Sequence, residues 1–246
     1  MKILVSEWIK TKRTPIRWLT FLTPVIFTAL IVWYFSLRTI TVETQISIFE
    51  AFFESWTALV IPLGTGLISG IMIHQEELAG GFNGFLGSKL PRRSLYLGKL
   101  TMLILLASTS TLLAVLVLVE GLSFILKISV SWPTFLAAAV MAIIGNLPLF
   151  AFHLWISFAW GMGASIGIGS GGILIAALMA TNLGNKIWPF VPWAWPVRLS
   201  GLAGVHLLYL PGMKLSHETL DSGFIKVQAL KGLIPAAVLF VALLAG

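Results

Sequence analysis

Apolar runs of about 20 residues constrain this chain more than any other feature of its sequence. A helix needs about 20 apolar residues to cross a bilayer core about 30 Å thick. Only 10% of the 246 residues are charged and 58% are hydrophobic, whereas soluble domains carry about 25% charged residues. The alternating segments of about ten residues that build outer-membrane barrels are not seen in the sequence. The sequence therefore predicts an all-α integral membrane protein.

The apolar runs predict one transmembrane domain over residues 1–246, with six spans and a long outer loop at 184–228. That loop opens with WPFVPWAWP, in which tryptophans favour the headgroup level and prolines preclude a regular helix. We expect it to lie in, or dip into, the outer interface, where Trp188, Trp193 and Trp195 are candidate contacts for a peptide or a lipid. The expected spans are 18–37, 55–73, 100–119, 134–156, 164–183 and 229–245.

Basic residues predict which side of the membrane each segment faces. Of the 16 Lys and Arg residues, five lie in residues 1–17 and four in residues 74–99, and such segments stay in the cytoplasm. Both termini are then cytoplasmic, and apolar spacing in residues 4–9 predicts a short interfacial helix. The other basic residues fall mainly in the long outer loop, where charge decides orientation less. Orientation and anionic lipid explain the net charge of +7, so nucleic-acid binding is not supported.

Small residues in the fifth span predict close helix packing. Gly163, Gly167 and Gly171 lie four residues apart, which places them on one helix face and lets another helix approach closely. The contact can lie within the chain or with a second chain. A shorter match, Gly66 and Gly70 in the second span, is a weaker signal because such pairs are common in apolar sequence.

Polar residues inside the spans have two interpretations. The hydroxyl groups at 108–111 can bond to carbonyls of their own helix, or face a substrate. Asn146, Pro148 and His153 in the fourth span can mark a pathway, but helix packing explains them better.

Motifs for catalysis or nucleotide binding are missing from the sequence. It holds no GxxxxGK[ST], HExxH or GxSxG motif and no cysteine. His217, Glu218 and Asp221 lie close together, but they lack zinc-ligand spacing, which favours a solvated loop. Glu54 and Glu120 lie at span ends, which argues against a proton-coupled carrier. We expect a permease that is not an enzyme and holds no cofactor itself.

The polar segment at residues 74–99 opens with two glutamates, continues through a glycine and an aromatic-leucine pair to Pro91, Arg92 and Arg93, and leads through Gly-Lys-Leu into the next span. In this order of residues it resembles the coupling segment of ABC-2 exporter permeases. Flanking apolar runs can anchor it at a membrane surface, where it can meet a soluble partner. At Gly81 the sequence departs from the family, in which many members carry threonine. The opening SEWIKTKRTPIRWLTFLTP is similar to permease subunits of lantibiotic-immunity transporters, of the MutE/EpiE and MutG kind. The matching residues are Glu76, Glu77, Gly80, Phe85, Leu86, Pro91, Arg92, Arg93, Gly98, Lys99 and Leu100.

The resemblance implies a multi-pass protein of the bacterial cytoplasmic membrane with a separate ABC ATPase, which would bind ATP and Mg²⁺. It also implies a second, related permease chain. Apolar side chains of the coupling helix would insert into a groove of the ATPase. The arginines would pair with that partner or with lipid phosphate, although orientation alone explains them equally well. The implied coupling residues are Glu76, Glu77, Phe82, Phe85, Leu86, Arg92 and Arg93.

The leading functional hypothesis is export of a lantibiotic or a similar cationic antimicrobial peptide from the membrane, for self-protection. One alternative is an ABC-2 permease for a drug, a lipid or a polysaccharide precursor. Another is a membrane anchor or sensor without transport, in which the tryptophan-rich loop would be a receptor surface.

Overall fold

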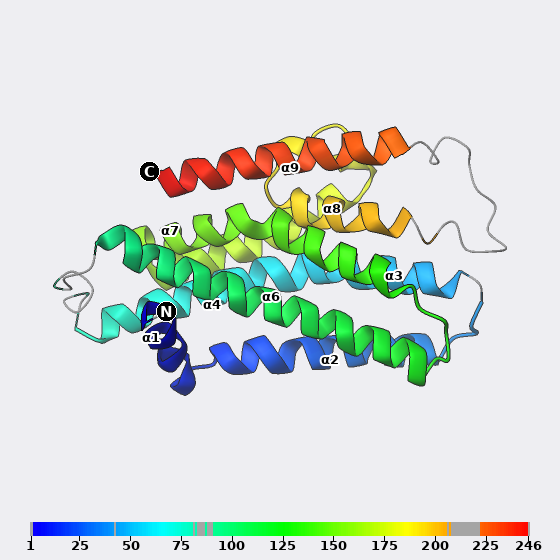
Figure 1. Ribbon diagram of the computed structural model, residues 1–246, viewed down its shortest axis with the longest axis horizontal. Coiled ribbons are helices and arrows are strands. Elements are labelled where there is room, and N and C mark those ends of the chain that lie inside the picture. The colour runs from blue at the N-terminus through cyan, green and yellow to red at the C-terminus, as the bar shows by residue number, and fades with distance from the viewer. Residues whose placement is uncertain are drawn as a thin grey trace.

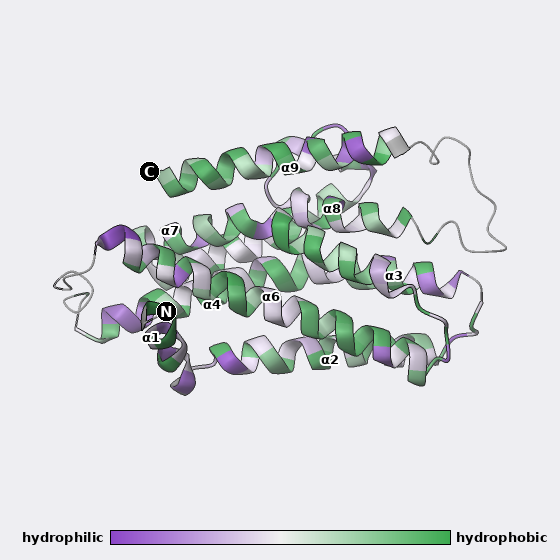
Figure 2. Ribbon diagram, viewed as in Figure 1, coloured by the Kyte–Doolittle hydropathy of each residue, from purple (hydrophilic) through white to green (hydrophobic). Residues whose placement is uncertain are grey.

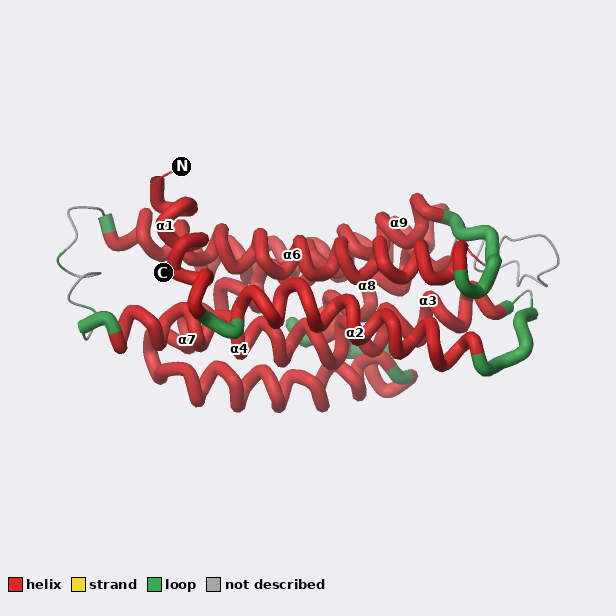
Figure 3. The backbone as a smooth tube through the Cα atoms, turned by 90° about the horizontal axis from the view of Figure 1, so that it is seen from below, coloured by secondary structure: helices red, strands yellow, loops and turns green. Residues whose placement is uncertain are grey.

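The computed structural model describes residues 2–41, 43–80, 82, 87, 91–205, 207 and 222–245. These residues form an elongated helical bundle whose loops lie at its two ends, and they contain no strand (Figures 1 and 3). Polar residues concentrate toward both ends, and apolar residues follow the length of the helices (Figure 2). The prediction of an all-α chain is thus confirmed for the described residues.

The helices run mostly along the bundle, and the short α1 lies across one end. We call this end, where α9 finishes, the α1 end, and the opposite one the α3 end (Figure 1). The elements are α1 (Lys2–Lys10), η1 (Thr11–Arg13), α2 (Ile16–Ser36), α3 (Thr44–Ser55), η2 (Trp56–Val60), α4 (Ile61–Leu78), α6 (Arg92–Phe124), α7 (Trp132–Ala180), η3 (Asn182–Gly184), η4 (Trp188–Phe190), α8 (Ala194–Gly204) and α9 (Ser222–Ala245).

Five helical stretches are long and apolar enough to cross a membrane. Among the residues that the structure describes, they are Ile16–Ser36, Thr44–Leu78, Arg92–Phe124, Trp132–Ala180 and Gly223–Ala245.

The second stretch begins earlier than the sequence predicted. The second span was predicted to begin at residue 55, because Glu43, Glu50 and Glu54 favour an acidic loop over 38–54, but α3 starts at Thr44 and continues through η2 into α4. Its Phe49, Phe52 and Phe53 are buried with Trp56 in one core cluster, and this helical spacing outweighs the glutamates between them. The π-helical turn η2 lies just before Pro62, which has no N–H to donate and crowds the preceding turn.

The fourth stretch, α7, is a hairpin and not a straight rod. Gly161 has φ 80° and ψ −179°, in a region that favours glycine, and it interrupts the helix. The chain reverses there, because His153 Nδ1 lies 3.1 Å from Ser165 Oγ, twelve residues later. In a straight helix those residues would be about 18 Å apart along the axis.

A buried polar seam joins α4 to both halves of α7. Ser165 Oγ, which contacts His153, also lies 3.1 Å from Ser69 Oγ. Farther toward the α3 end, Asn146 Nδ2 donates to Thr65 Oγ1 at 3.3 Å. All five side chains are almost fully buried, so these interhelical bonds stabilise the packing of the hairpin.

Close packing of the second half of α7 uses a different face from the one predicted. A Cβ added at Gly169 would lie 2.7 Å from Pro62 O, and one at Gly66 would lie 2.7 Å from Ser165 O. Within the described chain, a Cβ at Gly163, Gly167 or Gly171 would meet no atom within 4 Å. The Gly66 and Gly70 pair therefore packs against α7, whereas the predicted stripe faces away from the described part of the chain. Its contact with a second chain stays a prediction.

Candidate functional site

Four charged side chains form a compact ion-pair cluster at the α1 end, which we call the inner charge cluster. Lys99 Nζ lies 2.9 Å from Glu7 Oε2 and 2.7 Å from Glu76 Oε1. Lys10 Nζ lies 2.8 Å from Glu7 Oε1 and 2.5 Å from Glu76 Oε1. Two carboxylates and two ammonium groups balance one another, and the cluster joins α1, α4 and α6.

Burial makes the inner charge cluster a structural connection. Lys99 is only 1% exposed and lies at a depth where an unpaired charge would be costly. Burial lowers the pKa of Lys10, but hydrogen bonds to Glu7 and Glu76 outweigh this effect, so its pKa lies above the ordinary value. Charged hydrogen bonds therefore connect α4 and α6 directly to α1.

Among the predicted coupling residues, Glu76 is thus engaged inside the chain. Glu77 is exposed and its Oε2 lies 3.0 Å from His74 Nδ1. Arg92 and Arg93 are exposed at the first turn of α6 and make no ion pair with the described residues. Of the predicted coupling residues that the structure describes, these three have exposed side chains that a partner could reach.

The predicted aromatic anchor Phe82 packs against the bundle. Its backbone has φ 66°, and its N–H donates to Glu76 O at 3.3 Å. The Phe82 ring is half-buried, with its centroid 6.4 Å from that of Phe158. Phe85 and Leu86 lie outside the described residues, as does Gly81, so their role as coupling residues stays a prediction.

The tryptophan-rich segment folds into the bundle between α7 and α9. Trp188 is 5% and Trp195 is 3% exposed, and Trp195 Nε1 donates to Pro189 O at 3.0 Å. A Cβ at Gly145, midway along the first half of α7, would lie 2.9 Å from Pro196 N. The segment therefore lies against the middle of the first half of α7. The prediction that its prolines preclude a regular helix is wrong for its last residues, because α8 begins at Ala194 and takes in Pro196 in its first turn, where a missing N–H costs no helical hydrogen bond.

Trp193 has a similar packing role. A Cβ at Gly172 would lie 2.1 Å from its Nε1, so α7 needs a glycine there. Its ring also makes an edge contact with Phe152, at 6.0 Å between centroids. In this structure the three tryptophans mainly hold the segment in place, and their proposed contact with peptide or lipid stays a prediction. His217, Glu218 and Asp221 lie outside the described residues.

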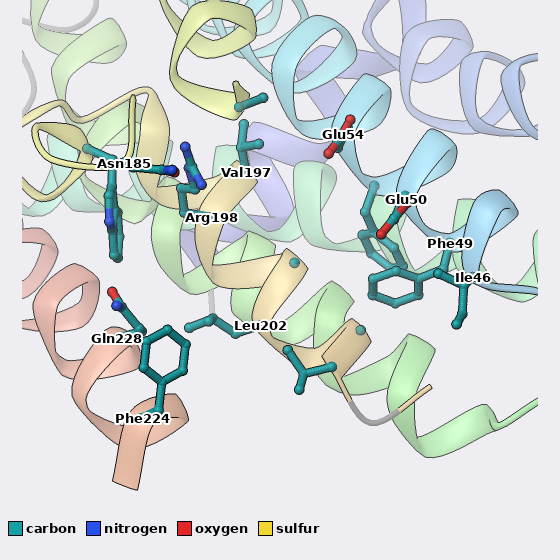
Figure 4. A pocket seen from close by; sticks show the side chains of 16 residues that line it. Ile46, Phe49, Glu50, Glu54, Asn185, Val197, Arg198, Leu202, Phe224 and Gln228 are labelled. Carbon is teal, nitrogen blue, oxygen red and sulfur yellow. The ribbon is translucent and has the colours of Figure 1, made fainter. Parts of the chain in front are cut away.

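A cavity of about 540 Å³ lies between α3, α8 and α9, toward the α3 end (Figure 4). We call it the acidic cavity. Its walls include Phe49, Phe53, Trp188, Leu202 and Phe224. Its polar side chains are Glu50, Glu54, Asn185, Arg198 and Gln228.

The two carboxylates of the acidic cavity are available for a ligand. Glu50 and Glu54 lie one turn apart on α3, both are exposed, and neither forms a hydrogen bond or ion pair with the described residues. Arg198, across the cavity, donates from Nε to Met179 O at 2.7 Å and from Nη2 to Thr181 O at 2.6 Å. It thereby satisfies carbonyls left open at the end of α7. The arrangement suits a cationic group beside an apolar surface.

Metal binding finds no support in the described part of the chain, where no three His, Cys, Asp or Glu side chains come together. The sequence analysis missed the inner charge cluster and the acidic cavity. Two features of the sequence could have indicated the inner charge cluster. Lys99 leads directly into an apolar run, and Glu7 is the single acid among the basic residues of 1–17.

Comparison with known proteins identifies the family. The family model described as ABC-2 family transporter protein matches residues 3–169, from α1 to the second half of α7. Comparisons with curated proteins and with solved structures gave no match. Because the matched region is more than half of the 246 residues, the chain belongs to the ABC-2 transporter family.

Proposed function

We propose that this chain is the membrane-spanning subunit of an ATP-driven exporter in the bacterial cytoplasmic membrane. ABC-2 membrane subunits are transport components that work with an ABC ATPase, which is typically a separate chain. The two arms of the α7 hairpin would each cross the bilayer, which raises the number of crossings to six. An even number agrees with the shared position of α1 and the end of α9 (Figure 1), and the α1 end would face the cytoplasm.

Coupling to the ATPase would occur at the α4–α6 connection. The observation that carries this proposal is the contrast between exposed Glu77, Arg92 and Arg93 and the buried Lys99 just behind them. The exposed charges would bind the ATPase, which would hold ATP and Mg²⁺. The inner charge cluster would pass its movement to α1, α4 and α6.

A second permease chain would complete the transport unit. The open face of Gly163, Gly167 and Gly171 supports this, because small residues allow the close approach of another helix. Related but different chains would pair through this face.

The substrate would be a lantibiotic or a similar cationic antimicrobial peptide, expelled from the membrane for self-protection. The acidic cavity supports this substrate, because Glu50 and Glu54 can attract lysine side chains while Phe49 and Phe224 contact apolar ones. Trp188 lines the same cavity and would contribute to peptide or lipid binding.

Co-purification with the neighbouring-gene ATPase tests the coupling proposal. We expect Glu77→Lys, Arg92→Glu and Arg93→Glu, combined in one variant, to lose the ATPase that wild type captures. Arg38→Glu is the control, because Arg38 is exposed near the α3 end and stacks on Tyr34. Equal capture by both variants would move the coupling site elsewhere. No capture by wild type would favour a sensor without transport.

Peptide resistance of cells tests the substrate. Resistance that depends on Glu50 and Glu54 would support a cationic peptide. Resistance that survives their replacement, with the complex still assembled, would favour a drug, a lipid or a polysaccharide precursor.

A further inference from the structure

A second cavity, of about 280 Å³, lies among α2, η2, α4, α6 and α7. It is separate from the acidic cavity and shares no lining residue with it. We call it the Asn146 cavity. Its lining is apolar except for Asn146 and the hydroxyl-bearing residues Thr23, Thr65, Ser110 and Thr111, and no ionisable side chain contributes to it.

Asn146 differs from the other residues that line this cavity because its side-chain oxygen lacks a hydrogen-bond partner among the described residues. It is fully buried, and its Nδ2 donates to Thr65 Oγ1 at 3.3 Å. Its Oδ1 has no hydrogen-bond partner among the described residues. Buried amide oxygens are nearly always hydrogen-bonded, so this one can accept a hydrogen bond from a group that enters the cavity.

The surrounding backbone leaves room for that ligand. η2, a π-helical turn of a kind often found at functional sites, forms one side of the cavity. A Cβ added at Gly64 would meet no atom within 4 Å, so space is open beside α4. Leu59 lines the cavity and is 48% exposed, so the cavity can be reached from the flank of the bundle, where lipid chains lie.

We propose that the Asn146 cavity binds a single-chain amphiphile whose uncharged end donates one hydrogen bond to Asn146 Oδ1. The volume is near the lower limit of ligand pockets, about 300 Å³, which suits one chain. The end group is uncharged because no lining side chain could pair with a charge at this depth. A hydroxyl or an amide N–H supplies the required donor.

Photolabelling of the permease–ATPase complex in lipid nanodiscs tests this site. The probes are a diazirine-bearing dodecanol and the matching diazirine-bearing dodecane without the hydroxyl. We expect the alcohol to label the peptide that contains Leu59 and Gly64, and Asn146→Leu to lower this labelling about tenfold, the equivalent of about 1.4 kcal/mol. The hydrocarbon probe should label wild type and Asn146→Leu equally and more weakly.

Two glycine variants keep the test decisive if Asn146→Leu fails to fold. Gly64→Leu should fill the cavity and block labelling by the alcohol. Gly201→Leu is the matched control, since Gly201 is also open but lines the acidic cavity, and it should leave labelling unchanged. Equal alcohol labelling of wild type and either cavity variant would overturn the proposal.

ATP and Mg²⁺ distinguish two sources of the ligand. Labelling that falls during ATP hydrolysis would identify the amphiphile as transported, and unchanged labelling would identify it as a resident lipid; both support the site. If the ATPase does not co-purify, the same labelling of the permease alone still tests the cavity, so failure of the coupling proposal is distinguishable.

Discussion

The two ends of the bundle treat their carboxylates in opposite ways. At the α1 end, Glu7 and Glu76 are each within 3 Å of two lysine side chains, and Lys99 between them is buried. In the acidic cavity, Glu50 and Glu54 are exposed and make no ion pair within the described chain. The paired charges of the inner charge cluster connect helices, whereas the carboxylates of the acidic cavity can bind a ligand. The comparison separates residues that stabilise the permease from residues that would recognise its substrate.

The largest effect should follow from Lys99→Met, which removes the buried ammonium group of the inner charge cluster. Breaking one partner of a buried ion pair costs about 3–5 kcal/mol, and here Glu7 and Glu76 would be left to share the single ammonium group of Lys10. Denaturant unfolding of the purified protein measures this loss. Lys186→Met is the control, since Lys186 is exposed and should change stability by less than about 0.5 kcal/mol. Equal stability of the two variants would show that the cluster is not structural.

The contact between α7 and the tryptophan-rich segment should depend on packing, where the α1 end depends on charge. In Gly172→Ala, the new Cβ would lie 2.1 Å from Trp193 Nε1, and such overpacking costs about 1–3 kcal/mol. Gly171→Ala, one residue earlier, meets no atom within the described chain and should gain about 0.5–1 kcal/mol of helix stability. Thermal unfolding of both variants gives the comparison. A destabilised Gly171→Ala would instead show that a second chain covers this face.

Glu50→Gln combined with Glu54→Gln should weaken ligand binding without affecting the fold. Loss of two partly exposed charge interactions corresponds to about 1 kcal/mol, or about a fivefold higher Kd for a lysine-rich amphipathic peptide. Fluorescence anisotropy in nanodiscs measures this affinity, and unfolding should be unchanged. Glu43→Gln is the control, because Glu43 is an exposed acid outside the cavity. A double variant that binds the peptide as wild type does would exclude the acidic cavity as its site.

The smallest expected effect is that of salt, which should weaken the exposed charges of the acidic cavity more than the buried charges of the inner charge cluster. Screening shortens the Debye length from about 8 Å at 0.15 M to about 3 Å at 1 M, and it acts mainly on exposed charges. The difference in peptide affinity between wild type and the Glu50/Glu54 variant should therefore shrink at 1 M salt. The stability lost in Lys99→Met should stay nearly constant. If that loss also shrinks, water and ions reach the inner charge cluster.

The sequence predicted those features that depend on neighbouring residues. Apolar length located the helices, and the gap predicted between the spans 134–156 and 164–183 contains Gly161, where α7 reverses. The start of α3 was missed although its signal was present, because Phe49, Phe52, Phe53 and Trp56 recur at helical spacing. The prediction of a loop gave Glu43, Glu50 and Glu54 more weight than the helical spacing of these aromatic residues.

The choice of packing face could not be predicted in the same way. The second half of α7 carries small residues on two faces: Gly163, Gly167 and Gly171 on one, and Ser165, Gly169 and Gly172 on the other. Only the second face meets α4 and Trp193. Both faces carry small residues at similar helical spacing, so the local sequence does not distinguish them. The position of the neighbouring helices decides which face is buried.

The sequence by itself determined that this chain is a helical membrane protein with charged connections at its ends, because the bilayer selects apolar length and helical backbone. Tertiary structure alone decided which charges are paired. Lys99 and Glu7 are 92 residues apart, and their attraction depends on how α1 and α6 lie in space. The same packing left Glu50 and Glu54 with no hydrogen bond or ion pair among the described residues and formed the two cavities, since both outcomes follow from distances between helices that no local pattern encodes.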